Sequence, residues 1–195
     1  MISKTDTSFH YLGLDISTSC TGLTLITGDG KLVEARYVYL SDEKTTFKKA
    51  SIVKAELERY KDYNIKCVTI EQNMLGFRQG SSSAGVLISL ARFNGVVSYL
   101  VSDVLKLDPI ALSVLTARKN AHVPIVRGIN AKEQVTKWVT EREPNYKWPT
   151  RTMKAGVRKG VVIFEKGVED ACDAYVMAHA AMNLNLSSEV ITILK

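Results

Sequence analysis

The stretch YLGLDISTSCTGLTLIT at residues 11–27 holds the pattern that decides the fold. Residues 11–16 are a short apolar run, and residues 21–27 alternate with β-branched side chains, so each segment predicts a strand. The Gly-Asp-Gly sequence at 28–30 is a hairpin signal, and residues 31–40 predict a third strand after it. We therefore expect three antiparallel strands at the start of the chain.

Alternating helices and strands are expected in the rest of the chain. The apolar periodicity predicts helices over residues 43–60, 81–105, 131–142 and 168–186, and short strands over 67–71 and 110–115. Residues 144–160 are basic, aromatic and irregular, and residues 188–194 either add a strand or pack against the body. The order β-β-β-α-β-α-β-α-α is typical of a mixed α/β fold. We expect one domain over residues 1–195, with residues 1–9 as a flexible N-terminus.

Composition limits the classes of protein to which the chain can belong. At 195 residues and 46% hydrophobic content it can bury a sizeable core. No uninterrupted apolar run reaches the roughly 18 residues of a membrane span, and the polar N-terminus does not resemble a secretory signal. We therefore expect a cytoplasmic protein, of a bacterium or a phage-infected host, with no membrane partner. The three cysteines show no metal-binding or redox spacing, and we expect them to be reduced and mostly buried.

The positive charge is concentrated in one segment. The whole chain carries a net charge of +6, whereas residues 118–159 alone hold eleven Lys and Arg against three Glu. That segment therefore carries +8 and the remainder −2. Such a concentration is expected where a protein contacts a phosphate backbone, although a solvated basic surface gives the same pattern.

Four acidic residues stand out against this background. Asp15 lies at the end of the first predicted strand, and Glu71 ends the strand at 67–71. Asp170 and Asp173 are three residues apart at the start of the last predicted helix, which places both on one side of it. A carboxylate beside an apolar core costs free energy unless it is paired or binds a metal, and neither strand acid has a basic neighbour in sequence.

Each acid alone has an ordinary explanation, such as compensation of the helix dipole by Asp170. The four together are better explained by metal binding, because a set of carboxylates suits Mg²⁺, for which Mn²⁺ can substitute. Two such ions about 3.5–4 Å apart can activate a water and stabilise the leaving oxygen in phosphodiester hydrolysis. In this hypothesis Asp15 bridges both ions, and Glu71, Asp170 and Asp173 complete their coordination.

These acids lie in motifs that resemble the RuvC family of Holliday-junction resolvases, within the ribonuclease-H-like superfamily. The motifs follow one another in the family's order over roughly residues 11–180: GLDIS at 13–17 with TG at 21–22, IEQ at 70–72, LARFNG at 90–95, AKEQV at 131–135 and DACDA at 170–174. Each motif alone is weak, whereas their order and spacing together are fairly specific. The length of the segment 144–160 resembles a phage or viral version of the family.

The resemblance implies a ribonuclease-H-like fold with a five-stranded mixed sheet, in which three antiparallel strands precede parallel ones. It implies that Asp15, Glu71, Asp170 and Asp173 are catalytic and bind two Mg²⁺ ions. It also implies a homodimer that places one active site on each of two opposed strands of a four-way DNA junction. The activity implied is that of a crossover junction endodeoxyribonuclease, which acts in recombination and repair and leaves nicks that a ligase can seal.

Further residues are assigned to DNA by the resemblance and by charge. Lys132 matches a family lysine that contacts phosphate near the scissile bond, and we count it with the catalytic residues. Lys119 is a second match, made less secure by an apparent insertion at residues 121–129. A bulky residue after the glutamate wedges into the junction in relatives. The remaining candidates for DNA contact are Met74 and Phe77 as wedges, Arg78 beside them, and Arg151, Lys154, Arg158 and Lys159 in the segment 144–160.

Other functions remain open at this stage. A flap or replication-fork nuclease and a ribonuclease H would use the same carboxylates on the same fold. A non-catalytic junction-binding protein would not need all four acids. An ATP-binding module of the actin and sugar-kinase type also begins with a strand, an Asp and Thr-Gly, but it needs a longer chain and leaves Glu71 unexplained.

Overall fold

Five strands form the main sheet in the computed structural model, which describes residues 9–72 and 84–189. The strand order is β3-β2-β1-β4-β5, and β1 occupies the centre. β1 pairs antiparallel with β2, and β2 with β3, whereas β4 pairs parallel with β1 and β5 with β4. The strands are β1 His10–Ile16, β2 Cys20–Thr27, β3 Leu32–Tyr39, β4 Ile65–Glu71 and β5 Ile110–Leu112. The expected five-stranded mixed sheet is confirmed.

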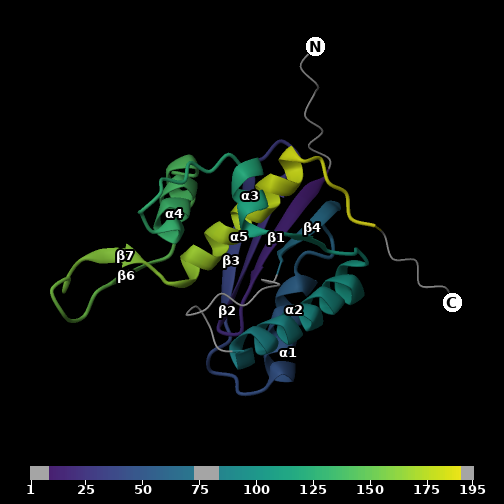
Figure 1. Cartoon of the computed structure of the whole chain (residues 1–195), viewed down its shortest axis with the longest axis horizontal. Helices are drawn as coiled ribbons and strands as arrows, with labels where there is room; N and C mark the ends of the chain where they lie inside the picture. Colours follow the sequence, from purple (N-terminus) through teal and green to yellow (C-terminus); the bar gives the residue numbers. More distant parts are fainter. Residues whose placement is uncertain (1–8, 73–83, 190–195) are drawn as a thin grey trace, which may run out of the picture.

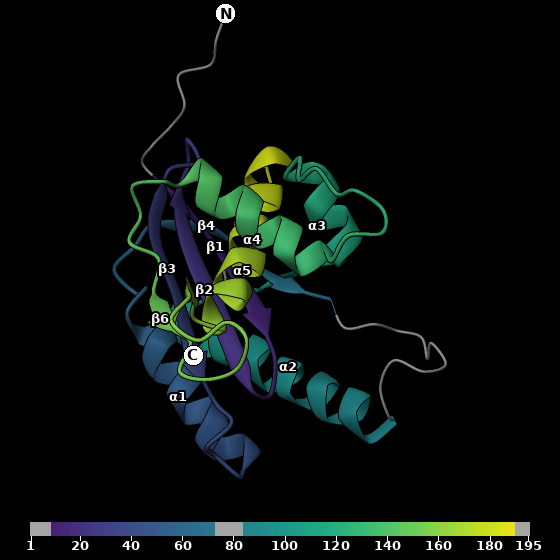
Figure 2. The same cartoon turned by 90° about the vertical axis from the view of Figure 1, so that its left-hand side faces the viewer.

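Helices cover both faces of this sheet (Figure 1). α1 and α2 pack on one face, whereas α5 crosses the other face and carries α3 and α4 on its far side, as Figure 2 also shows. A separate two-stranded hairpin of β6 and β7 projects from the body between α4 and α5. The bounds are α1 Thr46–Glu58, α2 Ala84–Leu105, α3 Val114–Asn120, α4 Ala131–Arg142, α5 Gly167–Asn183, β6 Thr150–Thr152 and β7 Val162–Phe164.

The alternation of side chains along β1 creates two separate hydrophobic cores. Leu12, Leu14 and Ile16 belong to the core under α1 and α2, whereas Tyr11 packs in the core under α5. Because successive side chains of a strand point to opposite faces, Asp15 shares the α5 side with Tyr11. The central strand therefore presents its carboxylate to α5 rather than to the larger apolar core.

Close contact between α5 and the sheet depends on two glycines. A Cβ atom on Gly13 would lie 2.0 Å from the carbonyl oxygen of Ala174, and one on Gly22 would lie 2.1 Å from that of Asp170. Thr24 strengthens the contact, because its buried hydroxyl donates a hydrogen bond of 2.8 Å to the carbonyl oxygen of Ala171. The backbone of the first turns of α5 therefore rests directly on β1 and β2.

Several boundaries and three elements differ from the sequence prediction. The strand predicted over 110–115 ends at Leu112, and residues 114–120 form the helix α3, capped by Ser113. The segment 144–160, expected to be irregular, contains β6, which pairs with β7. No strand is present at residues 188–189, although the backbone N–H of Ser188 donates to Lys66. Residues 190–194 and the predicted caps at 81–83 lie outside the described residues.

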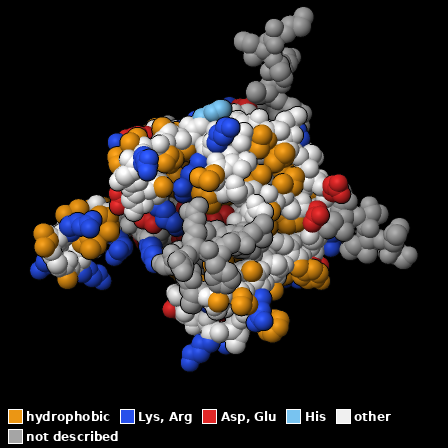
Figure 3. All heavy atoms as spheres, viewed as in Figure 1, with side chains coloured by type: hydrophobic (Ala, Val, Ile, Leu, Met, Phe, Trp, Pro, Cys, Tyr) orange, Lys and Arg blue, Asp and Glu red, His pale blue; other side chains and the backbone are white. Residues whose placement is uncertain are grey.

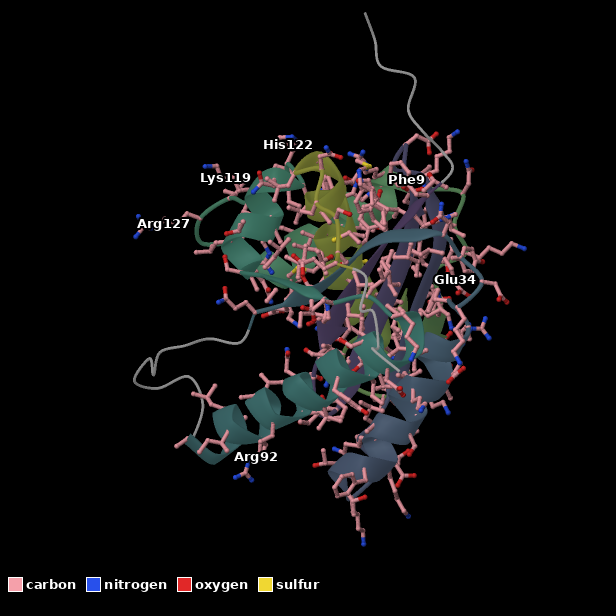
Figure 4. The ribbon with its side chains drawn as sticks, turned by 90° about the vertical axis from the view of Figure 1, so that its right-hand side faces the viewer. Phe9, Glu34, Arg92, Lys119, His122 and Arg127 are labelled. Atoms are coloured by element: carbon pink, nitrogen blue, oxygen red, sulfur yellow. The ribbon has the colours of Figure 1, made fainter. Side chains whose placement is uncertain are left out.

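α2 is the longest helix in the described part of the chain and has an unusually apolar surface. Its mean hydropathy over 18 residues is 1.5, and 28% of that window is buried, so by length and composition it could cross a membrane. The sequence expectation considered only uninterrupted apolar runs, and α2 is interrupted by Arg92 and Asp103. Figure 4 shows Arg92 pointing away from the body. The three cysteines are free and buried, as expected.

A tyrosine fastens the segment after α4 to the free edge of the sheet. The hydroxyl of Tyr146 donates to the carbonyl oxygen of Ala35 at 2.7 Å and accepts from its backbone N–H at 3.0 Å. Ala35 lies in the edge strand β3, and the Tyr146 ring contacts Trp148 at a centroid distance of 4.7 Å. The base of the β6–β7 hairpin is therefore held against the sheet.

Acid is expected to destabilise the protein through His179 on α5. The imidazole is buried, its ring centroid lies 4.2 Å from that of Tyr175, and its Nε2 has no hydrogen-bond partner within residues 9–72 and 84–189. Burial, with a smaller effect of Arg142, lowers the pKa of His179 to about 3. Because the folded pKa lies below the unfolded one, stability is complete above pH 6.5 and falls as the pH drops toward 3.

His179→Leu should remove most of this acid sensitivity. In urea titrations, the loss of unfolding free energy between pH 7 and pH 5 is expected to be about 2 kcal/mol smaller than in the unaltered protein. The control Val126→Leu, which places a leucine at an exposed position, should leave that loss unchanged. An equal acid sensitivity in His179→Leu would show that other groups cause it.

Candidate active site

Two of the four carboxylates meet because their strands are parallel neighbours. Leu14 pairs with Ile70 in the β1–β4 ladder, so Asp15 and Glu71 are the next residues along each strand. Both side chains project toward α5, and the buried Asn94 of α2 donates to the Glu71 carbonyl oxygen at 3.1 Å. The end of β4 is thereby fixed beside the end of β1.

The first turns of α5 bring the other two carboxylates to the same edge of the sheet. Asp15 pairs with Gly22 in the β1–β2 ladder, and the backbone of Asp170 rests on Gly22. Asp173 follows one turn later and is 8% exposed, as is Asp15. The prediction that both α5 acids share one side is confirmed, since both line the same cleft as Asp15 and Glu71.

A cleft of about 540 Å³ contains these acids. Figure 3 shows acidic atoms near the middle of this face, with basic side chains beside them. Arg118 and Val114 from α3 and Lys132 from α4 line the α3–α4 side of the cleft. The opposite side is lined by Ser17, Ser19, Cys20, Tyr39, Ser41 and Lys166.

Burial and mutual repulsion oppose ionisation of these acids. Burial raises the pKa of Asp15 well above its ordinary value, and the nearby charges of Glu71, Asp173 and Asp170 raise it further. Burial also raises the pKa of Glu71, although a hydrogen bond with Asp15 opposes the effect. The pKa of Asp173 is raised by burial too, in spite of its basic neighbours. The carboxylates thus hold more negative charge than the protein neutralises.

Two basic side chains face Asp173 across the cleft. The guanidinium of Arg118 lies 3.5 Å from one carboxylate oxygen and the Nζ of Lys132 lies 3.7 Å from the other. Burial alone would lower the pKa of Lys132, but Asp173, Asp15 and Asp170 together raise it. The buried Nε of Arg118 has no hydrogen-bond partner among the described residues. An anionic group that enters the cleft could supply that partner.

The structure brings Lys132 into the cleft but not Lys119. Figure 4 shows Lys119 on the outer side of α3, directed away from the sheet, and the residue that lines the cleft is Arg118. Arg118 lies one helical turn after Val114, which lines the cleft as well, whereas Lys119 is rotated about 100° further around the helix. Ala117 in α3 and Ala121 at its C-terminal cap are buried, and their burial fixes which side of the helix faces the cleft. The sequence prediction contained no helix here, so it could not distinguish Arg118 from Lys119 in this way.

The donor set suits a hard divalent cation. All four cleft acids supply oxygen ligands, and their unneutralised charge is what a bound cation would relieve. Cys20 does not compete as a ligand, because burial, followed by hydrogen bonding to Asp170, raises the pKa of its thiol. Among the described residues, however, no three His, Cys, Asp or Glu side chains are arranged ready to hold an ion. The residues therefore fit a cation by chemistry, and their side chains would close around it.

The residues of the segment 144–160 that are predicted to contact DNA do not line the cleft. Four of the five cations of the segment 144–160 were predicted to contact DNA, and these lie on the β6–β7 hairpin and its loop: Arg151, Lys154, Arg158 and Lys159. All four are exposed. Met74, Phe77 and Arg78 lie outside the described residues. The roles proposed for all seven residues stay predictions.

Comparisons with known proteins point to one kind of fold. No family model and no curated protein matches the sequence. A solved structure of Thermus thermophilus RuvC in complex with a Holliday junction substrate matches with a TM-score of 0.60 and 12% identity, covering 92% of this chain and 98% of that one. A second Thermus thermophilus RuvC structure matches with a TM-score of 0.60 and 13% identity, covering 94% and 100%.

The yeast mitochondrial Holliday junction resolvase Ydc2 is also similar. Its TM-score is 0.53 at 15% identity, and the match covers 93% of this chain and 80% of that one. At such low sequence identities, structural similarity gives information about the fold, whereas the chemistry must be inferred from the residues of the site. The chain has the ribonuclease-H-like fold that the RuvC resolvases share.

Proposed function

We propose that this chain is a structure-selective endonuclease that hydrolyses phosphodiester bonds in four-way DNA junctions with the help of divalent cations. The observation that carries the proposal is the cleft at the central strand, where buried carboxylates from β1, β4 and α5 face two cations. The structural neighbours include a RuvC in complex with a Holliday junction substrate, which supports a junction as the substrate.

Each side chain of the cleft has a role in this proposal. Asp15, Glu71, Asp170 and Asp173 would hold the Mg²⁺ ions, with Mn²⁺ as a substitute. Bound there, such ions supply a water of lowered pKa and stabilise the leaving oxygen. Arg118 and Lys132 would bind the non-bridging oxygens of the scissile phosphate and orient it, because they already point at the carboxylates that the phosphate must approach.

One cleavage assay tests the proposed function. A four-way junction, a flap, a linear duplex and an RNA–DNA hybrid of shared sequence are incubated with the protein in Mg²⁺, with each strand labelled in turn. We expect paired, symmetric nicks in the junction, with 5′-phosphate ends that a ligase seals. Preferred cutting of the hybrid or the flap would replace the junction as substrate, and no cutting of any of them in Mg²⁺ or Mn²⁺ would refute the nuclease.

Arg118 and Lys119 offer a matched pair of substitutions. Arg118→Ala should lower the single-turnover cleavage rate by about 100-fold, because a buried donor to the reacting phosphate is lost. Lys119→Ala removes the same charge from a side chain outside the cleft and should change the rate by less than about threefold. Equal effects of the two substitutions would show that only the overall charge of α3 matters.

We further propose that the chain acts as a homodimer through α1 and α2. A groove of about 580 Å³ runs between these helices, and it is lined mainly by apolar atoms. Phe47 and Tyr99 beside it are 81% and 68% exposed, which is unusual for aromatic residues on a monomer. Two opposed strands must be cut to resolve a junction, and a second copy seated on this face would supply the second site.

Sedimentation velocity should therefore give the mass of a dimer, and Tyr99→Asp should give that of a monomer. The monomer should nick single strands while losing paired cuts within one binding event. Val126→Asp, which charges an exposed apolar residue of the loop after α3, should stay dimeric. A monomeric unaltered protein, or one that sediments with lipid vesicles through α2, would contradict this assembly.

A further inference from the structure

The β6–β7 hairpin has features that neither the core nor the cleft requires. Its strands pair through Thr150–Phe164, Arg151–Ile163 and Thr152–Val162 and do not join the main sheet. Hydrogen bonds between Met153 and residues 160–161 continue the pairing toward the tip. The hairpin projects well clear of the body (Figures 1 and 3). We call residues 150–164 the arm.

The arm is strongly and uniformly basic. Its residues 150–164 contain four Lys and Arg and no Asp or Glu. The arm residues Arg151, Lys154 and Lys159 are exposed, and in the described part of the chain they form no ion pair with an acid. A projecting element gains no folding energy from unpaired cations, because their mutual repulsion opposes it. A polyanionic partner would neutralise them.

The tip of the arm is a defined turn rather than a loose loop. The N–H of Lys159 donates to the Gly156 carbonyl oxygen at 3.0 Å, and Gly156 and Gly160 have φ angles of +77° and +86°. This turn presents Val157, whose side chain is fully exposed at 108%, between flanking basic residues. Apolar side chains flanked by cations are what DNA-binding ribbons insert into the minor groove.

The base of the arm is fixed to the elements that build the cleft. The N–H of Glu165 donates to Pro149 at 3.0 Å, and the Tyr37 hydroxyl of β3 donates to the Glu165 carboxylate at 2.7 Å. The Tyr39 hydroxyl accepts the N–H of Gly167, the first residue of α5, at 3.1 Å. Asp170 follows within one helical turn. The arm and the catalytic carboxylates therefore keep a constant separation.

Charge also determines which side of the arm could receive a polyanion. The groove of about 400 Å³ between the arm and the helices α4 and α5 is lined by four acids, Glu133, Glu141, Glu165 and Glu169, and by two cations, Lys137 and Arg158, so its charged lining is negative on balance. These acids repel phosphates from that side. Arg151, Lys154 and Lys159 do not line the groove, so the outer side and the tip are left for binding.

We infer that the arm is a second DNA-binding site, which grips the backbone of the duplex leading away from the cleaved phosphate. The inference rests on the proposed function for the identity of the polyanion. From Thr150 to Val157 an extended chain spans at most about 23 Å at roughly 3.3 Å per residue. At about 3.4 Å per base pair this corresponds to about seven base pairs of duplex. A limb shorter than that offers the arm fewer phosphates to contact than a long limb does.

The test combines a triple substitution with limbs of two lengths. Arg151→Ala, Lys154→Ala and Lys159→Ala are introduced together, and the control replaces Lys31, Lys61 and Lys106, three exposed lysines in the connections after β2, α1 and α2 that line neither the cleft nor the groove beside the arm. Binding is measured by fluorescence anisotropy from 50 to 250 mM salt. The probes are a junction with limbs of 20 base pairs and one with limbs of five base pairs closed by loops.

We expect the unaltered protein to bind the long-limbed junction at least about tenfold more tightly than the short one. The arm variant should bind both equally, and its slope of log affinity against log salt should be smaller by about 2 to 3. Val157→Ser should weaken binding to long limbs without changing that slope. The control should behave like the unaltered protein. Unchanged affinity and slope in the arm variant would overturn the inference.

Cleavage assays distinguish a failure of this inference from a failure of the proposed function. At saturating protein, the arm variant should cut the short-limbed junction at the rate of the unaltered protein, because its cleft is intact. If the unaltered protein cuts neither junction, the proposed function fails. The arm is still supported as a DNA-binding site if the arm variant binds a plain 20-base-pair duplex more weakly than the unaltered protein does. An equal affinity of both proteins for that duplex and for the long-limbed junction would refute it.

Discussion

Asp15→Asn should abolish cleavage while leaving DNA binding intact. We expect the Mg²⁺-dependent rate to fall by at least about 10³-fold, equivalent to about 4 kcal/mol of activation free energy. Asp15 is the central carboxylate of the cleft, adjacent to Glu71 and surrounded by the α5 acids, so no neighbouring ligand can replace it. Single-turnover cleavage of a labelled junction measures the rate, and anisotropy with Ca²⁺ in place of Mg²⁺ measures binding.

The same substitution, which lowers activity, should raise the stability of the protein when no metal ion is present. In EDTA at pH 7.5 we expect Asp15→Asn to melt a few degrees higher, because repulsion in the cleft is relieved. Since the folded pKa of Asp15 is raised, the unaltered protein should lose stability as the pH rises from the unfolded pKa toward the folded one. Mg²⁺ should raise the melting temperature of the unaltered protein and not that of the variant; an equal rise in both would refute the role of Asp15 as a ligand.

Gly22→Ala should damage the active site through the backbone alone. The added methyl group would lie 2.1 Å from the carbonyl oxygen and 2.3 Å from the carbonyl carbon of Asp170, neither of which can rotate away. The start of α5 must then move off β2, carrying both of its carboxylates with it. We expect a loss of about 3 kcal/mol in unfolding free energy and about 100-fold in cleavage rate.

Gly85→Ala provides the control for this substitution. Nothing lies within 4 Å of the position of its Cβ atom, and the residue is in the first turn of α2, where it does not line the groove between α1 and α2. Alanine has the higher helix propensity, so stability should rise by up to about 1 kcal/mol with cleavage unchanged. Denaturant titration measures the unfolding free energy of both variants, and the cleavage assay measures their rates. A Gly22→Ala protein that is as active and as stable as the control would show that α5 tolerates displacement.

The main sheet and four of the helices were predictable because their patterns are long and regular. The β-branched pattern at residues 21–27 lies within β2, and α4 begins and ends where the periodicity indicates. The sequence showed that Asp15 and Glu71 each end a strand, whereas their pairing depends on the parallel β1–β4 ladder, which only the resemblance implied. The proximity of these acids to Asp170 and Asp173 could be predicted only from the order of the family motifs, because local sequence does not specify how α5 crosses the sheet.

The elements that escaped prediction are short and owe their form to contacts distant in sequence. α3 has only seven residues, too few for periodicity to distinguish it from the strand before it. Without its phase, Arg118 could not be preferred to Lys119 as the residue facing the cleft. β6 and β7 have three residues each and are separated by nine, so no short-turn signal announces them. Their positions depend on Tyr37, Tyr39 and Tyr146.

Tyr146 also affects how copies of this protein can meet. An edge strand with free N–H and C=O groups invites a strand from another molecule, which leads to open-ended aggregation. At Ala35, in the middle of β3, one phenol hydroxyl satisfies both groups, so an incoming strand would find that position closed. Self-association by sheet extension through β3 is thereby blocked at its midpoint, which favours solubility and leaves helical surfaces for assembly.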